Sequence, residues 1–350
     1  MQVRTHAGDR DAPRARRTSW ILGLAIGVIA LVVVVQLAGG LEAAVRELAH
    51  ADPKWIAIGV VFEATSFLFI ALHLRRIVDR AEAVRLGGSY QLALVVYGLG
   101  AVTPAAPLEG VALGVQDLHR RGLSRRRALF ALGFSEWFSN VALFTILAVD
   151  LVLATVFEDV RHDERVPFLL LALGIVAALV LAGLIVTNKR TITALNLMVH
   201  RARFWRATPS PAELEATVAR LHADRDAVIG GRRKQVVLVL LSIGAWLFDL
   251  ACLQAALLAM GVHANPDQLI LAYGAGILAT AVPFVPAGFG LTEIAMPAVL
   301  HHYGVPLAPA LAGTLAYRGL GTVLPAVAGA VLAFGMRRRR RGYRDLPSGA

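Results

Sequence analysis

Long apolar runs constrain the fold of this chain more than any other feature of its sequence. Several of them contain about 20 residues, enough for a helix to cross a hydrocarbon core of ~30 Å. The chain is 57% hydrophobic and only 17% charged, which is too apolar for a soluble protein. We therefore predict an all-α polytopic membrane protein. The apolar blocks are residues 19–38, 55–74, 89–118, 128–154, 167–187, 235–260, 268–302 and 309–335.

The basic residues predict how these blocks cross the membrane. Thirty of the 35 Lys and Arg residues lie in five segments, which the positive-inside rule assigns to the cytoplasm. Block 89–118 lies between two such segments and must return to the cytoplasmic face, whereas block 268–302 lies between loops without Lys or Arg and must enter from outside. We predict six full spans and two re-entrant helical hairpins, in a multi-pass protein of the cell (cytoplasmic) membrane with both termini cytoplasmic. The basic segments are 1–18, 75–88, 119–127, 188–234 and 337–344.

A helix-breaking sequence followed by a glutamate interrupts each hairpin block. Paired Pro/Gly-interrupted segments of this kind point to the substrate site of a transporter. The backbone N–H groups that open the second arms, near Leu108 and Leu291, should attract anions. The alternative, eight or more full crossings, leaves each arm about a dozen apolar residues, short of the ~17 required. The breaks run from Thr103 to Glu109, with Pro104, and from Pro283 to Glu293, with Pro286, Gly288 and Gly290.

The two halves of the chain match in the order and spacing of their features. Residues 119–124 align with 301–306, and fourteen residues after the glycine of each segment comes an ionisable residue, Glu136 or Arg318. Each half reads as span, span, hairpin, span, so we predict an inverted-topology repeat; the alternative is chance recurrence of short apolar motifs. The predicted parts are a basic cytoplasmic tail (1–18), a single membrane domain (19–335, with repeat one at 19–154, repeat two at 167–335 and a cytoplasmic amphipathic loop at 188–234) and a basic cytoplasmic tail (336–350).

Six ionisable residues are predicted at membrane depth, where a charged side chain costs ~3 kcal/mol. Five acids and one base cannot all pair, so some must be protonated, face water or bind a cationic ligand. The alternative for each is a salt bridge or hydrogen bond that holds the bundle together. We assign Glu109, Glu136, Glu293 and Arg318, with Pro104, Pro286, Gly288 and Gly290, to substrate binding, and Glu63 and Asp249 to proton or ion coupling.

Arg318 is the most specific single signal, because apolar sequence surrounds it for several turns. A guanidinium there can bind a lipid phosphate with two parallel hydrogen bonds. It can equally form a structural pair with Glu136 or Glu293. Together, the anion-binding end and the acidic end suit a zwitterionic or aminoacylated phospholipid headgroup.

Other ligands and an enzymatic role are disfavoured. We expect no metal and no cofactor, since the ten histidines are scattered and Cys252 is the lone cysteine. The basic segments should contact anionic headgroups at the cytoplasmic face, and we expect no nucleic-acid partner. No soluble segment is long enough for a catalytic domain, so we do not expect an enzyme.

With these residues in view, the chain resembles the transmembrane-region family of the lysylphosphatidylglycerol synthase/flippase over residues 20–335. The resemblance implies a stand-alone membrane module without the synthase domain, acting as a flippase or lipid carrier. It rests on Thr103-Pro104 with Glu109, Arg120-Arg121-Gly122 leading to Glu136, Val282 to Gly290 with Glu293, and Gly304-Val305 followed by Arg318.

These observations lead to three hypotheses. The first is a carrier that moves a phospholipid or polyprenyl-linked lipid between leaflets. The second is an intramembrane lipid-modifying enzyme that uses Glu109 or Glu293 as a general base, although no nucleophile–base pair is visible in the sequence. The third is a non-transporting partner that docks a lipid-modifying enzyme through the 188–234 loop.

Overall fold

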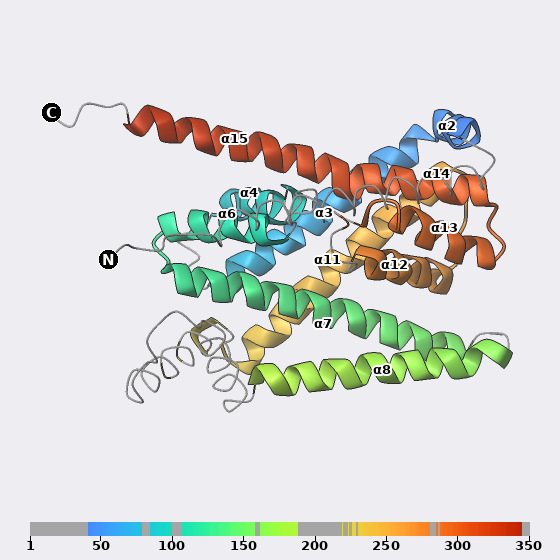
Figure 1. Cartoon of the computed structure of the whole chain (residues 1–350), viewed down its shortest axis with the longest axis horizontal. Helices are drawn as coiled ribbons and strands as arrows, with labels where there is room; N and C mark the ends of the chain where they lie inside the picture. The colour runs from blue at the N-terminus through green and yellow to red at the C-terminus, as the bar shows by residue number, and fades with distance from the viewer. Residues whose placement is uncertain are drawn as a thin grey trace, which may run out of the picture. The chain divides into compact units, whose positions relative to one another are not determined.

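The computed structural model describes residues 41–78, 85–99, 107–157, 162–187, 230–280, 285 and 288–344, with isolated residues 219, 223 and 226–228. This part of the chain is helical and contains no strand, which confirms the predicted all-α class (Figure 1). Five helices are long and apolar enough to cross a membrane, and they coincide with five of the six predicted full spans. The remaining span, 19–38, lies outside the described residues. The candidate spans are Pro53–Val78, Arg125–Leu153, Arg165–Gly183, Arg232–Ala259 and Leu307–Phe334.

The chain divides into two compact units, described separately below. Unit 1 comprises Met1–Phe67, Gln91–Leu113 and Leu247–Ala350, and unit 2 comprises Leu68–Tyr90 and Gly114–Trp246. Neither unit coincides with a predicted repeat, because helices α3 (Pro53–Val78) and α11 (Arg232–Ala259) each contribute residues to both.

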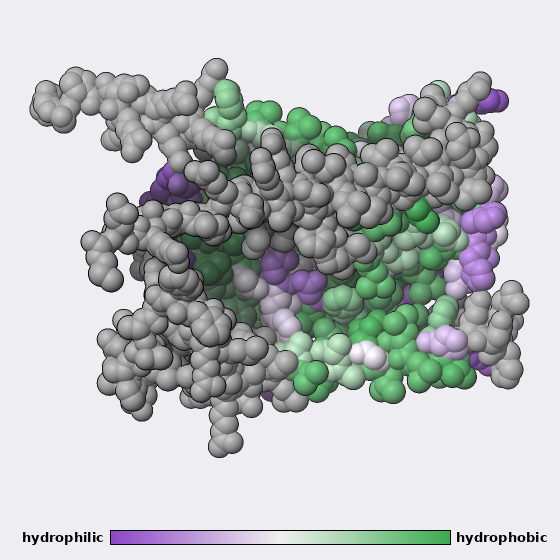
Figure 2. Space-filling view, in the orientation of Figure 1, coloured by the Kyte–Doolittle hydropathy of each residue, from purple (hydrophilic) through white to green (hydrophobic). Residues whose placement is uncertain are grey.

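Unit 2 contains the ends of α3 and α6 (Pro107–Arg120), the starts of α4 (Leu86–Ala93) and α11, and two long helices, α7 (Arg125–Phe157) and α8 (His162–Thr187). Helices α7 and α8 pack side by side (Figure 1). Only 6% of the apolar stretch of α8 is buried, and its exposed side chains are mainly Leu and Val. Hydrophobic side chains cover much of the coloured part of the surface in Figure 2. Such a surface is stable against lipid and not against water.

Unit 1 contains α2 (Leu41–Ala49), the beginning of α3, the end of α11, and a C-terminal series of short helices. Helix α12 packs on α13, α13 on α14, and α14 on α2. A π-helical segment, η1, packs against α15. The bounds are α12 Pro266–Thr280, α13 Thr292–His302, α14 Leu307–Arg318, η3 Gly319–Val323, α15 Leu324–Arg344 and η1 Leu94–Leu99.

Helix starts in unit 1 follow from capping residues in the sequence. The carboxylate of Asp52 accepts the N–H of Lys54 (2.9 Å) at the start of α3, where Pro53 occupies the first helical position. At the start of α12 the side chain of Gln268 reaches back to accept the N–H of Asn265 (3.2 Å). Both helices therefore begin where the sequence specifies.

Two turns that the sequence aligns, after α6 and after α13, have the same local structure. Gly122 and Gly304 adopt φ of 90° and 91°, a left-handed conformation that strains a residue with a Cβ atom. In each turn the N–H of the residue after the glycine donates to the carbonyl five positions earlier, and a histidine Nδ1 contacts a carbonyl four residues on. These contacts are Leu123 N–H to Leu118 O (3.1 Å), Val305 N–H to Leu300 O (3.0 Å), His119 to Leu123 O (2.8 Å) and His301 to Val305 O (2.9 Å).

The π-helical segment η3 has a cause in the sequence. Pro325 has no backbone N–H, and inside an α-helix its ring would clash with the carbonyl four residues earlier, at Gly321. The chain widens at this point, and the N–H of Leu324 donates to the carbonyl of Gly319, five residues before it. The nearby helix α15 approaches η1 closely, since a Cβ atom on Gly98 would lie 2.5 Å from the Pro325 carbonyl oxygen.

The arms of the two predicted hairpins are short. The segment Leu86–Leu99 is an apolar helix below spanning length, and α12 and α13 have 15 and 11 residues. The first break, at 100–106, and most of the predicted loop at 188–234 lie outside the described residues. Re-entry into the membrane, the number of spans and the inverted repeat stay predictions.

Candidate functional site

The described end of the break between α12 and α13 needs glycine at two positions. Gly288 and Gly290 adopt positive φ, 61° and 83°. A Cβ atom on Gly288 would lie 2.9 Å from both the Cα of Thr280 and the hydroxyl of Thr292. Only glycine allows the loop to fold back this closely onto the end of α12.

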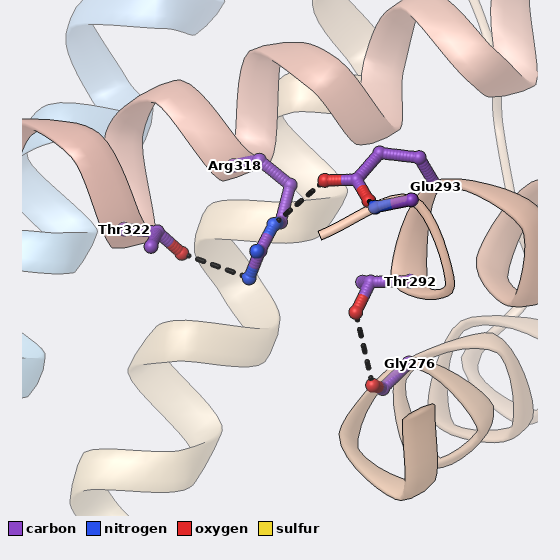
Figure 3. Close-up of polar contacts among 6 residues, drawn as sticks. Gly276, Thr292, Glu293, Arg318 and Thr322 are labelled. Atoms are coloured by element: carbon purple, nitrogen blue, oxygen red, sulfur yellow. Dashed lines mark hydrogen bonds and ion pairs between the residues drawn. The ribbon is translucent and has the colours of Figure 1, made fainter. Parts of the chain in front are cut away.

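Small residues also bring the two arms themselves together. A Cβ atom on Gly276 would lie 2.2 Å from the terminal methyl of Met296, so α13 occupies the space that a side chain on α12 would fill. The hydroxyl of Thr292 donates to the carbonyl of Gly276 at 3.3 Å (Figure 3). The break is therefore held by packing and by a cross-arm hydrogen bond.

Glu293, at the start of α13, has both carboxylate oxygens occupied. Its Oε2 accepts the N–H of Gly290 at 2.6 Å, and its Oε1 accepts the Nε–H of Arg318 at 3.0 Å. The side chains of Glu293 and Arg318 are 3% and 9% exposed. We predicted that backbone N–H groups near Leu291 attract an anion. One of them, the N–H of Gly290, is bound by the protein's own carboxylate, that of Glu293.

Arg318, at the end of α14, is fixed from three sides. Besides Glu293, its Nη1 donates to the hydroxyl of Thr322 at 3.0 Å (Figure 3), and its guanidinium carbon lies 4.9 Å from the ring centroid of Phe289. Of the two acids considered as its partner, Glu293 makes the ion pair. The guanidinium therefore ties α14 and η3 to the broken loop.

A second group of ionisable side chains surrounds Asp249 on α11. The hydroxyls of Tyr273 and Tyr317 both donate to its carboxylate, with Tyr317 at 3.1 Å from each oxygen. Glu63 on α3 is 5% exposed and lies beside the same carboxylate. The two acids predicted for proton or ion coupling are therefore brought together.

The remaining predicted site residues are placed less completely. Glu109 is the third residue of α6, as expected for the start of a second arm, but its side chain is outside the description. Pro104 and Pro286 also lie outside the described residues. Glu136 is a half-buried residue of α7 in unit 2, whereas Glu293 and Arg318 belong to unit 1.

Several contact residues were not identified from the sequence. Phe289, Thr322, Tyr273 and Tyr317 touch the charged groups, yet aromatic and hydroxyl side chains are common in apolar helices and gave no signal. Tyr317 alone had a usable one, because it directly precedes Arg318.

Unit 2 contains a buried His–Ser contact that the sequence did not reveal. The Nδ1 of His73 lies 3.1 Å from the hydroxyl of Ser242 and 3.1 Å from the carbonyl of Leu238, and both side chains belong to residues that are 3% exposed. A histidine whose Nδ1–H donates to a carbonyl cannot accept a serine proton at the same atom. The contact therefore links α3 to α11 rather than forming a nucleophile–base pair.

The five apolar helices of spanning length indicate the class of a multi-pass membrane protein, with a buried ion pair at a break between two shorter helices. The chain belongs to the family described as the lysylphosphatidylglycerol synthase TM region, which matches residues 20–329. The family resemblance drawn from the motifs is thereby confirmed.

Two relatives extend the comparison. A UPF0104 membrane protein of Methanothermobacter thermautotrophicus is 24% identical over 337 residues, covering 91% of this chain and 93% of the relative. Glycosyltransferase AglD of Haloferax volcanii is 25% identical over 306 residues, covering 80% of this chain but only 48% of AglD. The chain thus corresponds to about half the length of AglD.

Proposed function

We propose that this protein binds the headgroup of a phospholipid or polyprenyl-linked lipid at Arg318 and Glu293 and moves the lipid between leaflets. The observation that carries the proposal is the ion pair itself, buried at a helix break in apolar sequence. Buried ion pairs contribute little net stability, and charges at membrane depth are costly, so a functional reason for this pair is favoured. Membership of a lipid-synthase membrane family supports a lipid ligand.

The geometry suits an exchange of partners. A lipid phosphate can replace the Glu293 carboxylate on Arg318, whose guanidinium keeps its contacts with Thr322 and Phe289. The carboxylate keeps the Gly290 N–H and can accept an ammonium group. A zwitterionic or aminoacylated headgroup therefore leaves both buried charges paired, which a simple anion does not.

We further propose that the two halves form an inverted repeat whose relative rocking alternates access to the site. The matching turns after α6 and α13 and the Pro/Gly breaks support this arrangement. In this scheme both hairpins are re-entrant, the protein lies in the cytoplasmic membrane with cytoplasmic termini, and its basic loops contact anionic headgroups.

Reconstitution into vesicles with a headgroup-labelled phospholipid tests the proposal. Wild-type protein should expose inner-leaflet label to an impermeant quencher faster than empty vesicles. Arg318→Ala and Glu293→Gln should each slow this exposure about tenfold or more, since a hydrogen bond to a charged group contributes about 1.5–3 kcal/mol.

Arg121→Ala provides the matched control. Arg121 also donates to a carboxylate, Asp117 at 2.7 Å, but this i,i+4 pair lies within one helix end and is more exposed. The control should move lipid at the wild-type rate. Equal rates for wild type, Arg318→Ala and Glu293→Gln would refute the assignment of the site.

The name of AglD keeps an enzymatic alternative open: an intramembrane enzyme that modifies a lipid. A modified lipid formed in detergent micelles, where there is no second leaflet, would favour this alternative. Loss of that product in Glu293→Gln, with retention in Ser242→Ala, would place the chemistry at the helix break and not at the His73–Ser242 contact.

A further inference from the structure

Two carboxyl groups meet in unit 1 where α3 and α11 approach each other. The approach occurs at small residues, since a Cβ atom on Gly59 would lie 3.7 Å from the Cβ of Ala255. One turn further along α3 comes Glu63, and the facing position on α11 is Asp249. A Cβ atom on Gly321 would lie 3.6 Å from Glu63 Oε2 and 3.5 Å from Asp249 Oδ1, so both carboxyls are directed at this point of η3.

The hydrogen bonds of the two carboxyls differ. Asp249 accepts from the hydroxyls of Tyr273 and Tyr317, and phenol donors of this kind stabilise the ionised carboxylate. Glu63 is 5% exposed, and its Oε2 has no hydrogen-bond partner among the described residues. A charged oxygen left without a donor at such burial is costly, so the neutral acid form suits Glu63.

The surroundings do not neutralise both groups. The described titratable groups that act on the pair are Cys252 of α11, Tyr273 of α12, and Tyr317 and Arg318 of α14. Arg318 is the one cation among them and is already hydrogen-bonded to Glu293. Three carboxyls therefore share one guanidinium, and the pair requires a further positive charge.

We propose that Glu63 and Asp249 together hold a single exchangeable proton, carried by Glu63, and that its release and uptake couple lipid movement to a proton gradient. Asp249 stays a carboxylate under its two tyrosines. A proton suits this place better than Na⁺, because carrier sodium sites are built from unwound carbonyls whereas a thiol and two phenols flank this pair.

The coupling half of the proposal rests on the proposed function and has a structural route. Tyr317 bonds Asp249 and the next residue, Arg318, bonds Glu293. Gly321 lies against the carboxyl pair, and the next residue, Thr322, accepts from Arg318. A shift of α14 and η3 therefore alters both sites together.

Infrared difference spectroscopy of the purified full chain between two pH values tests the proton site without any transport. Wild-type protein should show a protonated-carboxyl band that shifts in D₂O and is lost at the higher pH. Glu63→Gln, a neutral mimic of the protonated acid, should lose the band. Asp117→Asn, which removes a carboxylate paired with Arg121, should retain it.

Three results would overturn the site: no band in wild type, a band that survives in Glu63→Gln but vanishes in Asp249→Asn, or a band displaced by adding Na⁺ at constant pH. The last would make the ligand a sodium ion.

Vesicles with and without an imposed pH difference test the coupling. The gradient should accelerate lipid movement by wild-type protein, and Glu63→Gln should lose that acceleration. If the carboxyl band behaves as expected but the rate of lipid movement does not depend on the pH gradient, the coupling is refuted and the proton site is retained. No lipid movement by wild type would instead refute the proposed function and leave the infrared result standing.

Discussion

The turn after α6 and the turn after α13 are built alike, yet the helices that follow them carry different charges. Gly122 and Gly304 have nearly the same φ, 90° and 91°, and each turn has the same backbone and histidine contacts. Fourteen residues later stands Glu136 on α7, half-buried, or Arg318 on α14, 7% exposed. The comparison teaches that the two turns share one backbone structure, while the buried ion pair follows only the second of them.

The largest expected effect comes from breaking that ion pair. Arg318→Ala leaves the Glu293 carboxylate buried without its cation, which should cost about 3–5 kcal/mol of stability. Glu136→Gln, at the corresponding half-buried position, should cost less than about 1 kcal/mol. Reversible unfolding in mixed micelles measures both.

A double variant separates stability from function. Arg318→Met with Glu293→Leu replaces the pair by apolar side chains. The free energy of unfolding of this variant should be close to that of wild type, since such replacements are often neutral. Its lipid movement should nevertheless be lost. Retained movement in this double variant would contradict a role for the pair in headgroup binding.

The next effect concerns how closely a neighbouring segment packs against two glycines, Gly98 on η1 and Gly133 on α7. A Cβ atom on Gly98 would meet the Pro325 carbonyl oxygen at 2.5 Å, so Gly98→Ala should destabilise the contact of η1 with α15 by about 1–3 kcal/mol. Gly133→Ala on α7 meets nothing within 4 Å and should instead stabilise its helix by about 0.5–1 kcal/mol. Equal melting shifts for the two variants would show that the close contact is not formed.

The smallest effect tests whether the turns at Gly122 and Gly304 are equivalent in structure. Gly122→Ala and Gly304→Ala each place a Cβ atom at φ near 90° and should each cost about 1 kcal/mol. Asn, which tolerates positive φ better, should cost less at both positions. Melting shifts that differ between the two turns would argue against equivalent structures.

The sequence predicted the long helices well and the site only in part. Hydropathy located five spans within a few residues, because the bilayer sets the length of an apolar helix. Arg318 and Glu293 stood out because charge in apolar sequence is rare, yet the sequence left phosphate, Glu136 and Glu293 open as partners. Which of them meets Arg318 depends on how α13 and α14 pack, and spacing along the chain does not determine this.

Other parts of the site gave weaker signals. Tyr273 donates to a residue on another helix, and nothing in its own segment distinguishes it from the apolar residues around it. Pro325 indicates that the helix is irregular near η3, but a proline in a membrane helix can equally produce a simple kink without a π-helical turn. Contacts between segments far apart in the chain therefore had to come from the structure.

The wide turn ahead of Pro325 also decides which side of α15 meets η1. A π-turn accommodates one residue more than an α-turn, so every later residue is rotated by about 100° from its place in an unbroken α-helix. This rotation sets Gly329 against the backbone of Leu94, where a Cβ atom would come within 2.3 Å of the carbonyl oxygen. If the segment closed into an ordinary α-turn without losing a residue, Ala328 would come to that place, and its methyl group would push the two segments apart. The width of this one turn therefore determines which residue of the C-terminal helix faces η1.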